Sequence, residues 1–382
     1  MSLETDQIQL SIQLQPEFGW AIKDEPVFGP GSVIQGKVQM EIKDPSLLSK
    51  ADRLRVVFHG SERSRNRDTL STQRRVQFFG VQRTLWEIKD FDLAIGQKYA
   101  FPFTLQLPMI QFPPSIRDDI YVCYFMLTVY LDQAPHDDDG DILLATIGKE
   151  VTLMPFLETC LFKTPLVQHI ACNNGDNVIV STHALDYVAN DTILIDVTVP
   201  THLVYSAIHM ELHQTIRSMD QTTRRVICSL KQQQEQQSSS TAAIINNTRI
   251  QLALPIPCDT IPSFTYSDMA SINYKLIIRF HGKKTILSSL LPSSNTKDNL
   301  HLELPIKIGT LGYGIRASEE LQVYATYRTP FDDSSDTRPC LPLPTFMRNV
   351  EYEESLPVYE DTRLPSYDSL YIYDDNGGTS VF

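Results

Sequence analysis

The sequence lacks the features that mark most enzymes, membrane-spanning proteins and disulfide-rich proteins. Its six cysteines are scattered, with neither a Cys-x-x-Cys pair nor the spacing of metal ligands, which favours reduced thiols and no bound metal. The longest apolar run, residues 121–131, is about half of the roughly 20 residues that a membrane-spanning helix needs. The N-terminal residues do not have the layout of a signal peptide, and no nucleophile, phosphate-loop or zinc-protease motif occurs. We therefore expect a soluble cytoplasmic protein without enzymatic activity or cofactor.

Sustained helical periodicity is also missing, and a period of two takes its place. Polar and apolar residues alternate over residues 8–14, 54–58, 193–199 and 208–212. Turn-forming residues separate these runs. Many short strands with regular turns predict an all-β fold made of immunoglobulin-type sandwiches.

The two halves of the chain repeat one unusual pattern. "LPMIQFPPSI" stands before "YFMLTVYL", and "LPIPCDTIPSF" stands before "NYKLIIRF", about 150 residues later. Proline donates no hydrogen bond to a sheet, so both Leu-Pro…Pro-Ser detours are expected at sheet edges. We predict two similar domains, residues 1–160 and 161–327. The tail, residues 328–382, is rich in Pro, Asp, Ser and Tyr and is expected to be unfolded on its own.

Charge is unevenly distributed along this acidic chain, whose formal net charge is −13. Residues 330–382 carry eleven acidic residues against three arginines, a net charge of −8. Residues 53–83 carry eight arginines against one glutamate and one aspartate, a net charge of +6. The overall charge argues against nucleic-acid binding, but guanidinium groups suit carboxylates and phosphates. The candidate residues for binding an anionic cargo are Arg63, Arg65, Arg67, Arg74 and Arg75.

Several stretches of the chain resemble segments of the arrestins in their order and spacing. "VFGPGSVIQGKV", "LRVVFHGSER", "FPFTLQLPMIQFPPSI" and "YVCYFMLTVYL" are similar to an arrestin N-domain, and "HLELPIKIGT" is similar to the strand that closes an arrestin C-domain. The resemblance covers roughly residues 8–312. Together with Pro-Tyr motifs in the tail, it points to the α-arrestins, the arrestin-related trafficking adaptors. It implies a non-enzymatic adaptor that brings a WW-domain ubiquitin ligase of the HECT class to the cytosolic tails of membrane transporters or receptors. It also implies recruitment to the plasma membrane and endosomes through cargo, and covalent modification by ubiquitin.

Two copies of Leu-Pro-x-Tyr lie eight residues apart in the tail stretch "ESLPVYEDTRLPSYDSL". Leucine replaces the first proline of the usual Pro-Pro-x-Tyr motif. A WW domain has an aromatic-lined groove for an extended, polyproline-type segment, and a tyrosine ring suits a half-wet pocket. One helical turn after Tyr367 would bring Leu370 back to the surface that contacts the WW domain. We therefore expect the second Leu-Pro-x-Tyr copy to bind the WW domain more strongly than the first. The candidate ligase-binding residues are Leu356, Pro357, Tyr359, Leu364, Pro365, Tyr367 and Leu370.

Other interpretations of these features remain open. The chain could be a retromer-like coat subunit or a cytosolic scaffold that recruits no ligase. Residues 367–370 also fit Tyr-x-x-apolar, which clathrin adaptors read on membrane-anchored cargo. The acidic tail could mask the arginine-rich segment, although salt screens such a contact beyond about 8–10 Å. We interpret His209, Glu211 and His213 as one exposed polar face of a strand.

Overall fold

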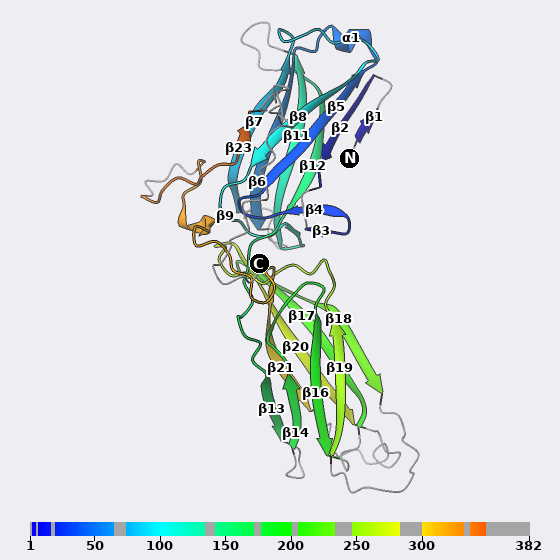
Figure 1. The fold of residues 1–382 in the computed structure, drawn as a ribbon, viewed down its shortest axis with the longest axis vertical. Coiled ribbons are helices and arrows are strands. Elements are labelled where there is room, and N and C mark those ends of the chain that lie inside the picture. The colour runs from blue at the N-terminus through cyan, green and yellow to red at the C-terminus, as the bar shows by residue number, and fades with distance from the viewer. Residues whose placement is uncertain are drawn as a thin grey trace, which may run out of the picture. The chain divides into compact units, whose positions relative to one another are not determined.

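The computed structural model consists almost entirely of β-strands (Figure 1). It describes residues 2–4, 7–16, 20–64, 74–133, 142–171, 177–200, 205–233, 247–282, 300–331 and 337–348. Within these ranges the only helices are α1 (Pro45–Leu48) and the 3-10 turn η2 (Tyr324–Thr326). Neither is long and apolar enough to cross a membrane. The predicted all-β fold is confirmed.

Two sheets form a first sandwich. The strand order of one sheet is β1 (Ser2–Glu4), β2 (Ile8–Leu14), β5 (Val33–Ile42), β8 (Lys98–Gln106) and β23 (Thr345–Met347). The order of the other is β3 (Ala21–Ile22), β4 (Glu25–Phe28), β12 (Ile142–Leu153), β11 (Tyr121–Gln133), β6 (Arg53–Ser64) and β7 (Arg75–Glu87), with β10 (Ile116–Arg117) beside β11. Alternate residues of these strands, such as Leu10 and Phe58, are fully buried in the core. The predicted period-two strands of this region are therefore present.

Two further sheets form a second sandwich. One has the order β13 (Leu166–Ala171), β14 (Asn177–Thr182), β16 (Thr192–Pro200) and β19 (Asn247–Pro255). The other has the order β15 (Asp186–Val188), β21 (His301–Gly309), β20 (Ala270–Gly282), β17 (Tyr205–Ser218) and β18 (Gln221–Gln233). Along β17, Met210 and Leu212 are buried, whereas Glu211 between them lies on the outer face. This alternation agrees with the interpretation of "HMELH" as a strand with one polar face.

The two Pro-Ser units make the same contacts in the two sandwiches. Ser115 donates its backbone N–H to the carbonyl of Leu153 at 2.8 Å, and its hydroxyl accepts from the N–H of Leu153 at 2.9 Å. Ser263 makes the same pair of bonds with Ile308, also at 2.8 and 2.9 Å. Each serine thus supplies hydrogen-bond partners for the backbone N–H and carbonyl of one residue near the end of a strand. On that side of the residue, no neighbouring strand supplies them. The repeat read from the sequence has a direct counterpart in hydrogen bonding.

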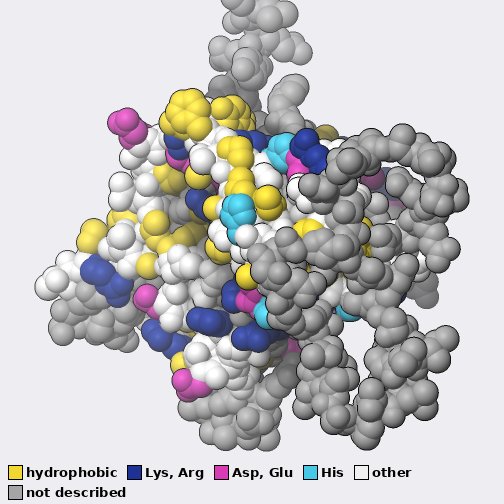
Figure 2. All heavy atoms as spheres, turned by 90° about the horizontal axis from the view of Figure 1, so that it is seen from below, with side chains coloured by type: hydrophobic (Ala, Val, Ile, Leu, Met, Phe, Trp, Pro, Cys, Tyr) yellow, Lys and Arg dark blue, Asp and Glu magenta, His cyan; other side chains and the backbone are white. Residues whose placement is uncertain are grey.

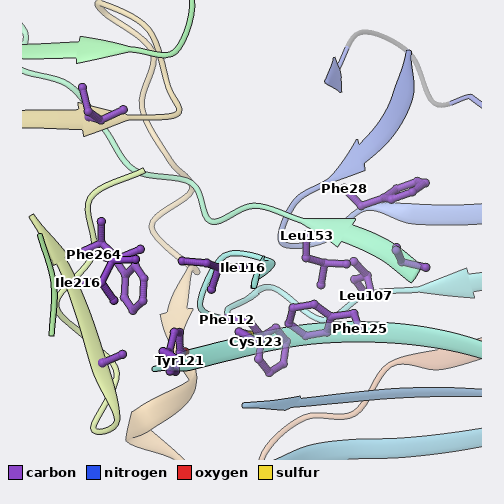
Figure 3. Packing of buried hydrophobic residues seen from close by; sticks show 14 of the residues in the cluster. Phe28, Leu107, Phe112, Ile116, Tyr121, Cys123, Phe125, Leu153, Ile216 and Phe264 are labelled. Atoms are coloured by element: carbon purple, nitrogen blue, oxygen red, sulfur yellow. The ribbon is translucent and has the colours of Figure 1, made fainter. Parts of the chain in front are cut away.

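Buried apolar side chains continue from one sandwich into the other. Figure 3 shows Phe112, Ile116 and Tyr121 of the first sandwich approaching Ile216 and Phe264 of the second. The ring centroids of Tyr121 and Phe264 are 6.3 Å apart. Both sandwiches belong to one compact unit, Met1–Met347, and residues 348–382 form a separate unit.

The chain returns to the first sandwich after β21. The strand β22 (Gln322–Val323) pairs with β9 (Ile110–Gln111), and β23 pairs with β8 at the sheet edge. The sequence predicted an unfolded tail from residue 328 onward, so the structure differs for residues 337–348. These residues have too few apolar side chains for a core of their own, but β8 offers an open edge to which a short strand can be added.

Candidate functional site

Three of the five candidate arginines lie at one end of the β6–β7 hairpin. Arg63 of β6 is directly opposite Arg75 of β7, and Arg74 immediately precedes β7. The hairpin brings them together because its strands pair antiparallel up to this point. Arg65 and Arg67 lie outside the described residues.

This arrangement of arginines does not favour stability. Like charges directly opposite each other in a sheet are destabilising. Arg75 donates to the hydroxyl of Tyr124 only at 3.5 Å, and the buried Nε of Arg63 has no hydrogen-bond partner in the described part of the chain. A buried donor without an acceptor costs about 1–3 kcal/mol. Such guanidinium groups are suited to an anionic partner that supplies the acceptors.

A cleft of about 460 Å³ is lined by Arg74 and Arg75, but not by Arg63. It lies between the start of β7, the residues just before β20 and the returning C-terminal segment. Its basic side chains are Arg74, Arg75 and Arg338, and its acidic side chains are Asp268 and the buried Glu62. The other lining residues are Val76, Gln77, Met269, Tyr324, Ala325, Tyr327, Thr329 and Phe331. The cleft therefore combines guanidinium groups with aromatic rings.

Glu62, at 1% exposure, lines this cleft and ties three parts of the chain together. Its Oε2 accepts from the hydroxyls of Tyr121 at 2.6 Å and Ser267 at 2.9 Å, and its Oε1 accepts from the hydroxyl of Tyr324 at 2.6 Å. Burial raises the pKa of the Glu62 carboxyl above its ordinary value, and the three hydroxyl donors partly oppose this rise. Burial and the adjacent carboxylate raise the pKa of Tyr324 as well, which keeps its hydroxyl protonated as a donor.

The ring of Tyr324 fixes the C-terminal segment on the first sandwich. It packs edge-on against Phe78 with centroids 4.9 Å apart and stacks on Phe112 at 6.2 Å. Farther along, Arg338 donates to the carbonyl of Ala325 at 2.9 Å, and Arg83 donates to the carbonyl of Met347. These contacts hold one wall of the cleft in place beside β7.

The cleft is suited to an anionic side chain or chain terminus. Guanidinium groups on two walls can donate to carboxylate or phosphate oxygens. Tyr327 and Phe331 offer apolar contact to the rest of such a ligand. The sequence identified Arg74 and Arg75, but not Arg338, which falls in the segment expected to be unfolded. The one sequence signal that could have indicated Arg338 is its charge, because it is one of three arginines in an otherwise acidic stretch.

The predicted ligase-binding residues, from Leu356 to Leu370, all lie outside the described residues. Comparison with protein-family models finds no matching family. Comparison with curated proteins likewise finds no match.

Proposed function

We propose that the chain is a non-catalytic adaptor. Its folded unit holds the anionic cytosolic tail of a plasma-membrane transporter or receptor, and its C-terminal motifs hold a WW-domain ubiquitin ligase of the HECT class. The ligase then ubiquitinates the cargo, which promotes endocytosis. In this proposal the protein is cytoplasmic and reaches the plasma membrane and endosomes through its cargo.

One observation above the others supports the assignment of cargo binding to the folded unit and of ligase binding to the C-terminal motifs. The compact unit ends at Met347, where β23 is paired with β8, and the first Leu-Pro-x-Tyr copy begins nine residues later, at Leu356. The 12 residues from Met347 to Tyr359 reach at most about 43 Å, and the 20 residues to Tyr367 at most about 72 Å. A ligase bound to Tyr359 or Tyr367 would thus be tethered within a short chain length of the folded unit, at a raised effective concentration.

The arginine-lined cleft supports the cargo half of the proposal. Its Arg74, Arg75 and Arg338 suit an acidic or phosphorylated tail. The resemblance to arrestin-related adaptors agrees with both halves.

Titration with an isolated WW domain tests the ligase half. The full chain is compared with Tyr359→Ala, Tyr367→Ala and the double variant by calorimetry. We expect saturable binding, a larger loss from Tyr367→Ala than from Tyr359→Ala, and no measurable binding by the double variant. Tyr373→Ala, a tail tyrosine outside both motifs, serves as the control and should bind as the wild type does. Unchanged binding and unchanged cargo ubiquitination with the double variant would reject the adaptor and favour a coat subunit that needs no ligase.

A further inference from the structure

A row of nitrogen-bearing side chains crosses the outer face of the second sandwich. His209 of β17 lies directly opposite Lys231 of β18 on one side and Arg279 of β20 on the other. Arg279 in turn lies opposite His301 of β21. Directly paired residues project from the same face of a sheet, so these four side chains form one line of about 14 Å. We call these four residues the histidine row. The ring centroid of His281 lies 6.1 Å from that of His209, beside the row.

The surroundings of the histidine row are predominantly basic. The other charged or titratable side chains on the same face are Glu211, His213 and Arg217 of β17, Arg224 of β18, Lys275 of β20, Glu303 and Lys307 of β21, and Asp186 of β15. Glu211 accepts from Arg279 and, at 2.8 Å, contacts His213, while Glu303 accepts from Lys275 at 3.0 Å. Six basic side chains therefore stand against three carboxylates, a net charge of +3 with neutral imidazoles in a chain of net charge −13.

Two of these cations, Arg279 and Lys275, form ion pairs within the second sandwich, whereas other charges of this face are open to solvent. Lys231, Arg224 and His301 are exposed. Figure 2, a view from below, shows lysine, arginine and histidine side chains at several places on the surface, with acidic side chains among them.

We propose that this face docks on an anionic lipid surface. Its charges are spread over four neighbouring strands of a sheet face, which matches an extended negative surface better than a single anionic group. This contact goes beyond the adaptor proposal, in which cargo alone brings the protein to the membrane.

Vesicle flotation with the full chain tests the proposal. Vesicles of phosphatidylcholine with 30% phosphatidylserine are compared with pure phosphatidylcholine, at low and high salt. Since a basic side chain near an anionic surface is worth about fivefold in binding, we expect Arg224→Glu with Lys231→Glu to weaken partitioning more than tenfold. Lys89→Glu with Lys98→Glu, the same charge change on the first sandwich, should leave partitioning within twofold.

Each outcome decides for or against the lipid surface. Selective and salt-sensitive binding to the anionic vesicles that Arg224→Glu with Lys231→Glu weakens supports it. Equal binding to both vesicle types, equal losses in the two glutamate variants, or no binding overturns it. Capture of a soluble polyglutamate peptide without vesicle binding would instead identify an acidic protein partner. Because the vesicles contain neither cargo nor ligase, failure here leaves the adaptor proposal untouched.

Discussion

The hydroxyl of Tyr324 donates a 2.6 Å hydrogen bond to Oε1 of Glu62, a residue 262 positions earlier in the chain. This bond fixes the point at which the C-terminal segment rejoins the first sandwich. Tyr121 and Ser267 donate to the same carboxylate. One buried glutamate thus ties both sandwiches and the returning segment together next to the arginine-lined cleft.

Replacing Tyr324 by phenylalanine should loosen the C-terminal segment. The ring contacts with Phe78 and Phe112 remain, but the bond to a carboxylate is lost, which costs about 1.5–3 kcal/mol. Limited proteolysis should cut residues 325–347 faster, and urea unfolding should report the loss of stability. Tyr327→Phe, for which no side-chain hydrogen bond is seen within the described residues, is the matched control. Identical cleavage rates in the two variants would contradict the role of the Tyr324 hydroxyl.

Replacing Glu62 by glutamine should change how stability depends on pH. Because the folded-state pKa of Glu62 lies above its ordinary value of 4.5, the folded protein binds this proton more tightly than the unfolded chain. The stability that Glu62 contributes at low pH is therefore lost as the pH rises from 4.5 through the raised pKa. Glutamine does not titrate, so the free energy of unfolding of Glu62→Gln should rise relative to the wild type over that window. Urea unfolding between pH 4.5 and 7.5 measures this difference, and parallel curves would contradict the raised pKa.

Charge reversal in the cleft should abolish binding of an acidic peptide. Arg74→Glu with Arg75→Glu removes two guanidinium groups and adds two carboxylates to the cleft. We expect a labelled glutamate-rich peptide to bind more than tenfold more weakly, and wild-type binding to fall as salt is raised. Lys89→Glu with Lys98→Glu carries the same charge change outside the cleft and should bind like the wild type. Equal weakening in both variants would show that net charge, not the cleft, governs binding.

The two Pro-Ser units should contribute equally and independently to stability. Ser115→Ala and Ser263→Ala each remove the hydroxyl that accepts from a buried backbone N–H, at a cost of about 1–3 kcal/mol. The serines share no partner, so the double variant should lose the sum of the two single losses. Urea denaturation of the three variants measures this. A loss confined to one serine would contradict the equivalence of the two units.

Much of the fold followed from local patterns, because burial of alternate residues leaves a period of two in strands such as β6 and β17. The Pro-Ser repeat was also readable, since proline excludes those positions from a ladder. The Glu62–Tyr324 bond was not predictable, because nothing local couples two residues so far apart in sequence. Likewise, β23 has the composition of an unfolded tail and becomes a strand only through the edge of β8. The arginines were recognised by charge, but their arrangement depends on the register of β6 and β7.

The adaptor proposal rests on a division between a folded unit that holds cargo and a tail that holds the ligase. The most direct test compares the intact chain with a chain that ends at Met347, which keeps β23. Each is assayed for capture of a WW-domain ligase and of the acidic peptide in the same buffer. We predict that the shortened chain binds the peptide as the intact chain does and captures no ligase. Full ligase capture by the shortened chain would contradict this account.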